Sequence, residues 1–86
     1  MLSLRFKRSA KRELLGLDDV SFVRVVQAIL ALQDNPRPRR YDTVAGKSDQ
    51  LRVWAGRDHR ILYEVDAAGR KITIVAVRKK DEGTYR

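Results

Sequence analysis

The fold of this chain is decided by the stretch Gln50-Leu51-Arg52-Val53-Trp54-Ala55-Gly56-Arg57-Asp58-His59-Arg60-Ile61-Leu62-Tyr63-Glu64. Apolar and polar residues alternate on both sides of Gly56-Arg57, which predicts two strands joined at that point. One face of the pair is expected to be apolar and to carry Leu51, Val53, Ile61, Tyr63 and Val65. The opposite face is expected to carry Arg52, Trp54 and Arg60, a combination that can contact phosphates and stack on a base.

Two helices are expected before this pair of strands. The first is short, covers residues 10–15 and is capped by Ser9. The second begins at Asp18 or Asp19 and ends at Asn35-Pro36, because the residue before a proline is pushed out of the helical conformation. Its apolar residues recur at intervals of three and four and are expected to face the core; they are Val20, Val23, Val26, Ile29, Leu30 and Leu32.

Strands are expected at residues 2–6, 49–55, 58–66 and 71–77, and residues 36–48 are expected to form an irregular connection. This order predicts an α+β fold of the form β-α-α-β-β-β, in which the last three strands form an antiparallel meander. The helical hairpin covers one face of the sheet, and the open face is expected to be basic.

Composition limits the function classes. The 86-residue chain has no cysteine and one histidine, which excludes disulfides, thiolate catalysis, cysteine-bound zinc and a histidine-rich metal site. No apolar run approaches the roughly 18 residues of a membrane span. We therefore expect a single cytoplasmic domain over residues 1–86, with no metal, no cofactor and no membrane partner.

Charge points to the kind of partner. The chain has 19 lysines and arginines against 11 aspartates and glutamates, a formal net charge of +8. This charge density on a small chain favours an anionic partner, either nucleic acid or an acidic protein.

Several motifs follow one another along essentially the whole chain. They are Ser9-Ala10-Lys11-Arg12-Glu13-Leu14, Leu32-Gln33-Asp34-Asn35-Pro36-Arg37-Pro38, Leu51-Arg52-Val53, Arg60 followed by Ile61-Leu62-Tyr63-Glu64-Val65, and a basic C-terminal cluster closing on Tyr85. The ordered set resembles the RelE/ParE superfamily of toxins from prokaryotic type II toxin–antitoxin systems. One departure is His59, which stands before Arg60 where the family commonly has tyrosine.

The resemblance implies a toxin that is silenced by a cognate antitoxin, expected to contribute an acidic, partly disordered segment. The RelE branch cleaves messenger RNA, typically on the ribosome, whereas the ParE branch inhibits DNA gyrase. Arg60, Arg52 and the C-terminal basic cluster followed by Tyr85 fit the RelE branch better. The resemblance therefore implies a metal-independent endoribonuclease, with gyrase inhibition as the alternative and antitoxin binding alone as a third reading.

By position, the resemblance implies catalytic roles for four residues. Arg60 would contact the scissile phosphate, Arg52 would assist proton transfer or phosphate binding, Lys79 is the best match to a later basic residue, and Tyr85 would stack on the substrate or act in acid–base chemistry. Contacts with RNA are further expected of Trp54, Arg57, Arg78 and Lys80. Independently of the family, strand alternation places Arg52, Arg60 and Lys79 opposite the apolar positions of their strands, provided that no strand bulges.

Other readings of these residues stay open. Trp54 could cover the open sheet or meet an antitoxin helix instead of a base. Tyr85 could merely hold the C-terminus, and the arginines of residues 36–40 could be a solvated loop or could bind ribosomal RNA. His59 could act as a general base, but its strand position favours packing on the helix-covered side.

Overall fold

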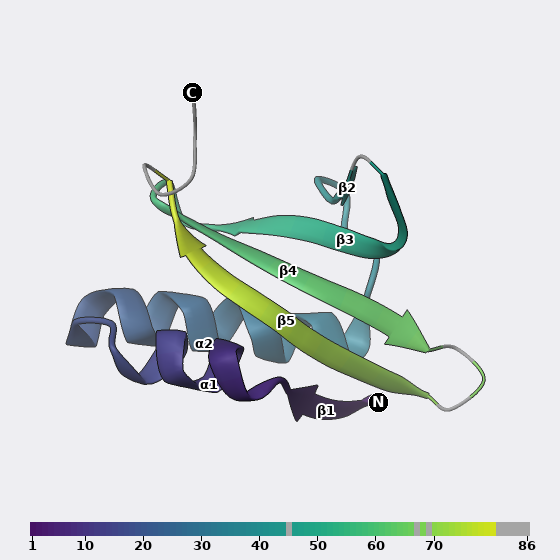
Figure 1. Cartoon of the computed structure of the whole chain (residues 1–86), viewed down its shortest axis with the longest axis horizontal. Helices are drawn as coiled ribbons and strands as arrows, with labels where there is room; N and C mark the ends of the chain where they lie inside the picture. Colours follow the sequence, from purple (N-terminus) through teal and green to yellow (C-terminus); the bar gives the residue numbers. More distant parts are fainter. Residues whose placement is uncertain (45, 67, 69, 81–86) are drawn as a thin grey trace.

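The structure is a computed structural model that describes every residue except 45, 67, 69 and 81–86, and the backbone alone of 47 and 48. Its elements, in chain order, are β1 (Ser3–Phe6), α1 (Arg8–Leu15), α2 (Asp19–Asp34), β2 (Asp42–Val44), β3 (Lys47–Ala55), β4 (His59–Asp66) and β5 (Lys71–Lys79). The two helices lie on one face of the sheet and leave the other face uncovered (Figure 1). The predicted α+β fold is confirmed.

The sheet has five strands in the order β1-β5-β4-β3-β2. The predicted meander of β3, β4 and β5 is antiparallel, and β1 extends it by pairing in parallel with β5. The irregular connection predicted over residues 36–48 is wrong at its end, because Asp42 and Thr43 pair with Arg52 and Leu51. Pairing with a strand that already exists makes β2 extended without any apolar alternation of its own.

The core forms between the helices and one face of the meander. Leu51, Val53, Ile61 and Tyr63 are buried as predicted, and Val65 packs against them half-buried. In α2, however, the buried residues are Val25, Ile29 and Leu32, while Val20, Val23 and Leu30 are exposed. The prediction for these last three is wrong because α2 is apolar on more than one side, and only one side can face the sheet.

The start of α1 is set by the sheet rather than by a capping side chain. The helix begins at Arg8 after Lys7, and Ser9 lies inside its first turn, so the predicted Ser9 cap is wrong. The Lys7 amide donates to the carbonyl oxygen of Ile74 at 2.9 Å, which continues the pairing of β1 with β5 up to the first helical residue. For α2, Asp18, one of the two residues predicted to begin the helix, occupies the N-cap position without a side-chain capping hydrogen bond, and the predicted end at Asn35 is confirmed.

Glu13 joins α1 to the edge of β5 beyond the end of β1. One carboxylate oxygen accepts a hydrogen bond from the Val77 amide at 2.8 Å, and the other lies 3.2 Å from Nε of Arg78. A strand edge leaves backbone amides unpaired, so this carboxylate replaces the partner strand at that position.

We expect Glu13→Ala to lower the free energy of unfolding by about 1–3 kcal/mol, because it leaves the half-buried Val77 amide without its acceptor. Glu13→Gln keeps an oxygen acceptor and should lose less. Urea unfolding of both variants measures the difference, with the exposed Lys11→Ala on the same helix as control. Equal losses in the two Glu13 variants would contradict the role assigned to the amide contact.

Tyr63 ties the core to the loop that follows α2. Its side chain is buried, and its hydroxyl donates to the carbonyl oxygen of Pro36 at 2.5 Å. Burial raises the pKa of Tyr63 to about 12, although the charge of Arg37 acts in the opposite direction. The loop over Pro36 is therefore held from inside the molecule.

This raised pKa predicts a loss of stability at alkaline pH. Tyr63 loses its proton at about pH 10 in the unfolded chain but only at about pH 12 in the folded chain. The free energy of unfolding should therefore fall as the pH rises from about 10 to about 12. Tyr63→Phe should lower stability by about 1 kcal/mol at pH 8 through loss of the hydrogen bond, and should flatten this alkaline decline. Urea unfolding of both proteins at pH 8 and pH 11 measures it; parallel declines would contradict the assignment.

Candidate functional site

One end of the uncovered sheet face carries a row of two arginines and a tryptophan. Trp54 on β3 pairs with Arg60 on β4, and Arg60 pairs with Arg78 on β5. Residues directly opposite each other on antiparallel strands point to the same side of the sheet, so the three side chains share the open face. The predicted common face of Trp54 and Arg60 is confirmed.

Arg60 and Trp54 are in contact. The guanidinium carbon of Arg60 lies 5.8 Å from the centroid of the Trp54 ring, within cation–π range. Trp54 is 43% exposed, so the ring retains surface for another partner. Nε of Arg60 is buried and has no hydrogen-bond partner among the residues that the structure describes. A buried, unpaired donor is costly, which makes Arg60 a candidate to bind an anion.

The neighbouring row contains Arg52, whose charge is partly neutralised. Arg52 pairs with Leu62 on β4 and with Asp42 on β2, and its guanidinium lies 3.6 Å from the Asp42 carboxylate. Its Nε is also buried without a partner within the described part of the chain. The structure brings Arg52 to the predicted face, but with an acidic neighbour that the sequence pattern did not indicate.

Further along the sheet, the open face is no longer basic. Gln50 donates to Glu64 at 3.3 Å, and Glu64 pairs with Thr73, which pairs in turn with Arg5. The open face is therefore basic, as expected, but mainly at one end and not along its whole length. Positive charge is concentrated at the end that carries Arg60 and Arg78.

The predicted placement of Lys79 on this face is wrong because β5 bulges. Leu62 pairs with Ala76 but Tyr63 pairs with Ile74, so Val75 is an extra residue on β5. A bulge of one residue reverses the alternation beyond it. Lys79 consequently pairs with His59 towards the helix-covered side, and Arg78 takes the place beside Arg60.

His59 lies where its strand position predicted. It is buried at 6% exposure and lines a hollow of about 350 Å³ on the helix side, together with Glu13, Asp18 and Lys79. This hollow contains both acidic and basic groups and lies away from the Arg60 row. His59 is thus a packed residue of the helix-covered side, separate from Arg60.

Arg57 and Lys80 line a second hollow at the free edge of β3. It has a volume of about 550 Å³ and is also lined by Pro38, Arg40, Val53, Trp54 and Gly56. Sequence reasoning noted the arginines of residues 36–40 as a basic loop but did not connect Arg40 with Trp54. The sequence showed only that this loop is positively charged, because the local sequence does not indicate which part of the sheet the loop approaches.

Tyr85 lies outside the described residues, so its predicted role stays a prediction. Within the described part of the chain, no group of three or more histidine, aspartate or glutamate side chains could hold a metal ion. None of the helices described is long and apolar enough to cross a membrane.

Comparison with known proteins agrees with this geometry. The family model for the ParE toxin of type II toxin-antitoxin system, parDE, matches residues 4–83. A search of curated protein sequences gives no match.

Solved structures show the same fold. The isolated RelE toxin of E. coli is 17% identical, with 96% of this chain and 88% of that chain covered and a TM-score of 0.82. A chain of the toxin-antitoxin complex RelBE2 from Mycobacterium tuberculosis is 22% identical, with coverages of 91% and 96% and a TM-score of 0.79. The YoeB/ParE toxin from Agrobacterium tumefaciens is 14% identical, with coverages of 91% and 98% and a TM-score of 0.77.

Proposed function

The chain belongs to the family of ParE toxins of type II toxin–antitoxin systems, and we propose that this toxin is a metal-independent endoribonuclease that cleaves messenger RNA on the ribosome. Solved relatives with this fold include toxin–antitoxin complexes, and a cognate antitoxin is the partner that would silence the toxin. The observation that carries the proposal is Arg60, which has no ion pair among the described residues and lies in cation–π contact with the partly exposed Trp54 on the sheet face that the helices leave uncovered.

The reaction requires no cofactor in this proposal. The 2′-oxygen of the RNA attacks the adjacent phosphorus, the bond from phosphorus to the 5′-oxygen breaks, and the products are a 2′,3′-cyclic phosphate and a 5′-hydroxyl. One proton leaves the 2′-hydroxyl and one is delivered to the 5′-oxygen. Negative charge builds up on the phosphorane between these steps, and fixed guanidinium groups stabilise such charge well.

Arg60 and Arg78 occupy directly opposing positions at the basic end of the face, and Arg52 lies one row away. Arg78 is held by Glu13 and Arg52 by Asp42, whereas no ion pair of Arg60 is found within the described residues. Arg60 is therefore assigned the scissile phosphate, with Arg78 as its neighbour. Arg52, which stays protonated, is assigned phosphate binding, and Tyr85 is the candidate for proton transfer.

Gyrase inhibition is the second candidate, favoured by the fact that the matching family model is that of the ParE toxins. It requires a surface that binds a protein rather than groups that move protons. The basic row would serve both functions, so only the chemistry of the products separates them.

The test is production of the chain alone in bacterial cells, with and without its antitoxin. Growth should stop without the antitoxin and resume with it, and transcripts should acquire 2′,3′-cyclic phosphate and 5′-hydroxyl ends. Loss of DNA supercoiling with intact transcripts would favour gyrase. Unchanged growth with soluble, folded protein would indicate a chain that only binds its antitoxin.

A further inference from the structure

The hollow at the free edge of β3 combines an aromatic face with three cations. Arg40, Arg57 and Lys80 line it, all exposed, together with Trp54, and none of the described residues that line it is acidic. The hollow beside His59 contains Glu13 and Asp18, and another near Arg5 contains Asp49, Glu64 and Asp66. Among the described residues, the β3 hollow thus differs from both because all of its charged side chains are cationic.

Three separate segments build this hollow, and hydrogen bonds hold each in place. The amide of Lys80 donates to the carbonyl oxygen of Asp58 at 2.6 Å, which fixes the end of β5 to the turn that carries Arg57. The Tyr63 hydroxyl holds the carbonyl of Pro36, and the Tyr41 amide donates to Pro38 at 3.2 Å on either side of Arg40. The cations are therefore presented by anchored backbone.

The edge of β3 is open at this point. Strand β2 pairs with β3 at Arg52, Leu51 and Lys47, and no described strand pairs with Val53 or Trp54 on that side. A hollow of about 550 Å³ is within the range of about 300–1,000 Å³ that small-ligand sites occupy. It therefore has room for a ring system stacked against Trp54.

We infer that this hollow holds one base of single-stranded RNA, stacked on Trp54, with the phosphates of the same strand between Arg40, Arg57 and Lys80. This inference rests on the proposed ribonuclease function and names where a nucleotide next to the cleaved bond lies. Arg60 contacts the same indole ring but does not line the hollow, so Trp54 lies between the base and the phosphate held by Arg60. Flat rings stack on any base, and cations at the rim accept the backbone without reading sequence.

Trp54 is the single tryptophan of the chain, so intrinsic fluorescence reports on this hollow directly. The probe is a six-nucleotide single strand with 2′-O-methyl groups throughout, which lacks the free 2′-hydroxyl and is not cleaved. Its binding should quench Trp54, and a matched strand with an abasic nucleotide placed at each position in turn should bind about 5- to 100-fold more weakly at one position.

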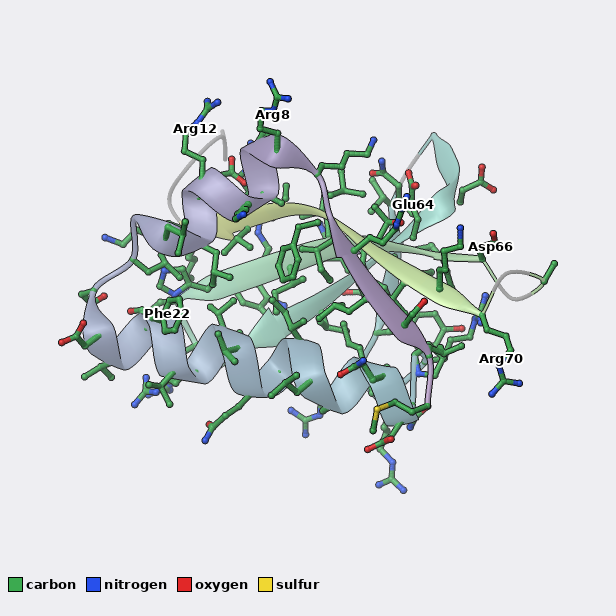
Figure 2. The ribbon with its side chains drawn as sticks, turned by 90° about the horizontal axis from the view of Figure 1, so that it is seen from below. Arg8, Arg12, Phe22, Glu64, Asp66 and Arg70 are labelled. Carbon is green, nitrogen blue, oxygen red and sulfur yellow. The ribbon has the colours of Figure 1, made fainter. Side chains whose placement is uncertain are left out.

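Arg40→Ala and Arg57→Ala test the rim of the hollow. Each should weaken binding about 5-fold and reduce the slope of log affinity against log salt by about one. The matched control is Arg8→Ala, which removes the same charge from an exposed side chain that extends outward from α1 (Figure 2). It should leave the fluorescence response unchanged.

The inference is overturned if Arg40→Ala, Arg57→Ala and Arg8→Ala all bind the strand equally, or if abasic and intact strands quench Trp54 alike. It is also overturned if an acidic antitoxin peptide quenches Trp54 while the strand does not, since the hollow would then belong to the protein partner. Cleavage is measured separately. If wild-type protein cleaves RNA but fails these binding tests, only the base-site inference is rejected and the proposed reaction stands. If wild-type protein binds the strand as described but produces no cyclic phosphate ends, only the proposed reaction is rejected.

Discussion

Arg60→Ala is expected to lower the rate of RNA cleavage by about 10²–10³, the typical cost of removing one group that stabilises charge in the transition state. No ion pair of Arg60 is found among the described residues, so its positive charge is available to a phosphate without breaking another salt bridge. The side chain points to the uncovered face, opposite the core residues Ile61 and Tyr63. The stability change should therefore stay within about 1 kcal/mol.

Arg60→Lys should recover only part of the lost rate, because an ammonium cannot make the two parallel hydrogen bonds of a guanidinium. The measurement is cleavage of a programmed ribosome complex and of free RNA by both variants, with thermal melts as the control for folding. Wild-type cleavage or growth arrest by a normally folded Arg60→Ala protein would show that the catalytic assignment is wrong. Gyrase would then become the better candidate target.

Arg78→Ala should slow cleavage by about 10-fold or more, whereas Lys79→Ala should change the rate less than about 3-fold. The reason is that Arg78 lies in the same row as Arg60, whereas Lys79 does not. The bulge at Val75 puts Arg78 opposite Arg60 and turns Lys79 towards His59. Each variant removes one positive charge from adjacent positions of the same strand, so the pair controls for net charge. The opposite ranking would mean that the sequence-based choice of Lys79 was correct for function despite its placement.

Arg78 also contacts Glu13, so its loss could act through stability instead of catalysis. Glu13→Gln separates the two effects, because it removes the charge that holds Arg78 but keeps the guanidinium on the face. Cleavage by Glu13→Gln should be close to wild type once the fraction of folded protein is accounted for. If Glu13→Gln lowers the cleavage rate as much as Arg78→Ala does, Arg78 must depend on Glu13 to hold its guanidinium in position.

Parts of the open face carry acidic side chains that offset the positive charge. Asp42 neutralises part of Arg52, and Glu64 with Gln50 makes the far end of the open face mixed in charge. If the proposed function holds, we expect the RNA strand to bind mainly at the end formed by Trp54, Arg60 and Arg78, with Arg57 and Lys80 on the adjoining rim. The net charge by itself does not indicate which part of the face an anionic partner would contact.

The sequence by itself determined the order of the elements other than β2, and the common face of Arg52, Trp54 and Arg60. Both follow from local periodicity, because successive side chains of a strand alternate between faces whatever lies beside it. The end of α2 at Asn35 is equally local, since the residue before a proline is pushed out of the helical conformation.

The tertiary structure decided the rest. Which apolar side of α2 meets the sheet depends on the shape of the surface it packs against, so Val25 is buried and Val23 is exposed. The bulge at Val75 exists only in the pairing of β5 with β4, and it exchanges Arg78 for Lys79 beside Arg60. Arg40 lines the same hollow as Trp54, and the Tyr63 hydroxyl holds the loop that leads to Arg40 at Pro36. Each of these features requires two distant segments to be in contact, and a periodicity within one segment carries no information about its partner.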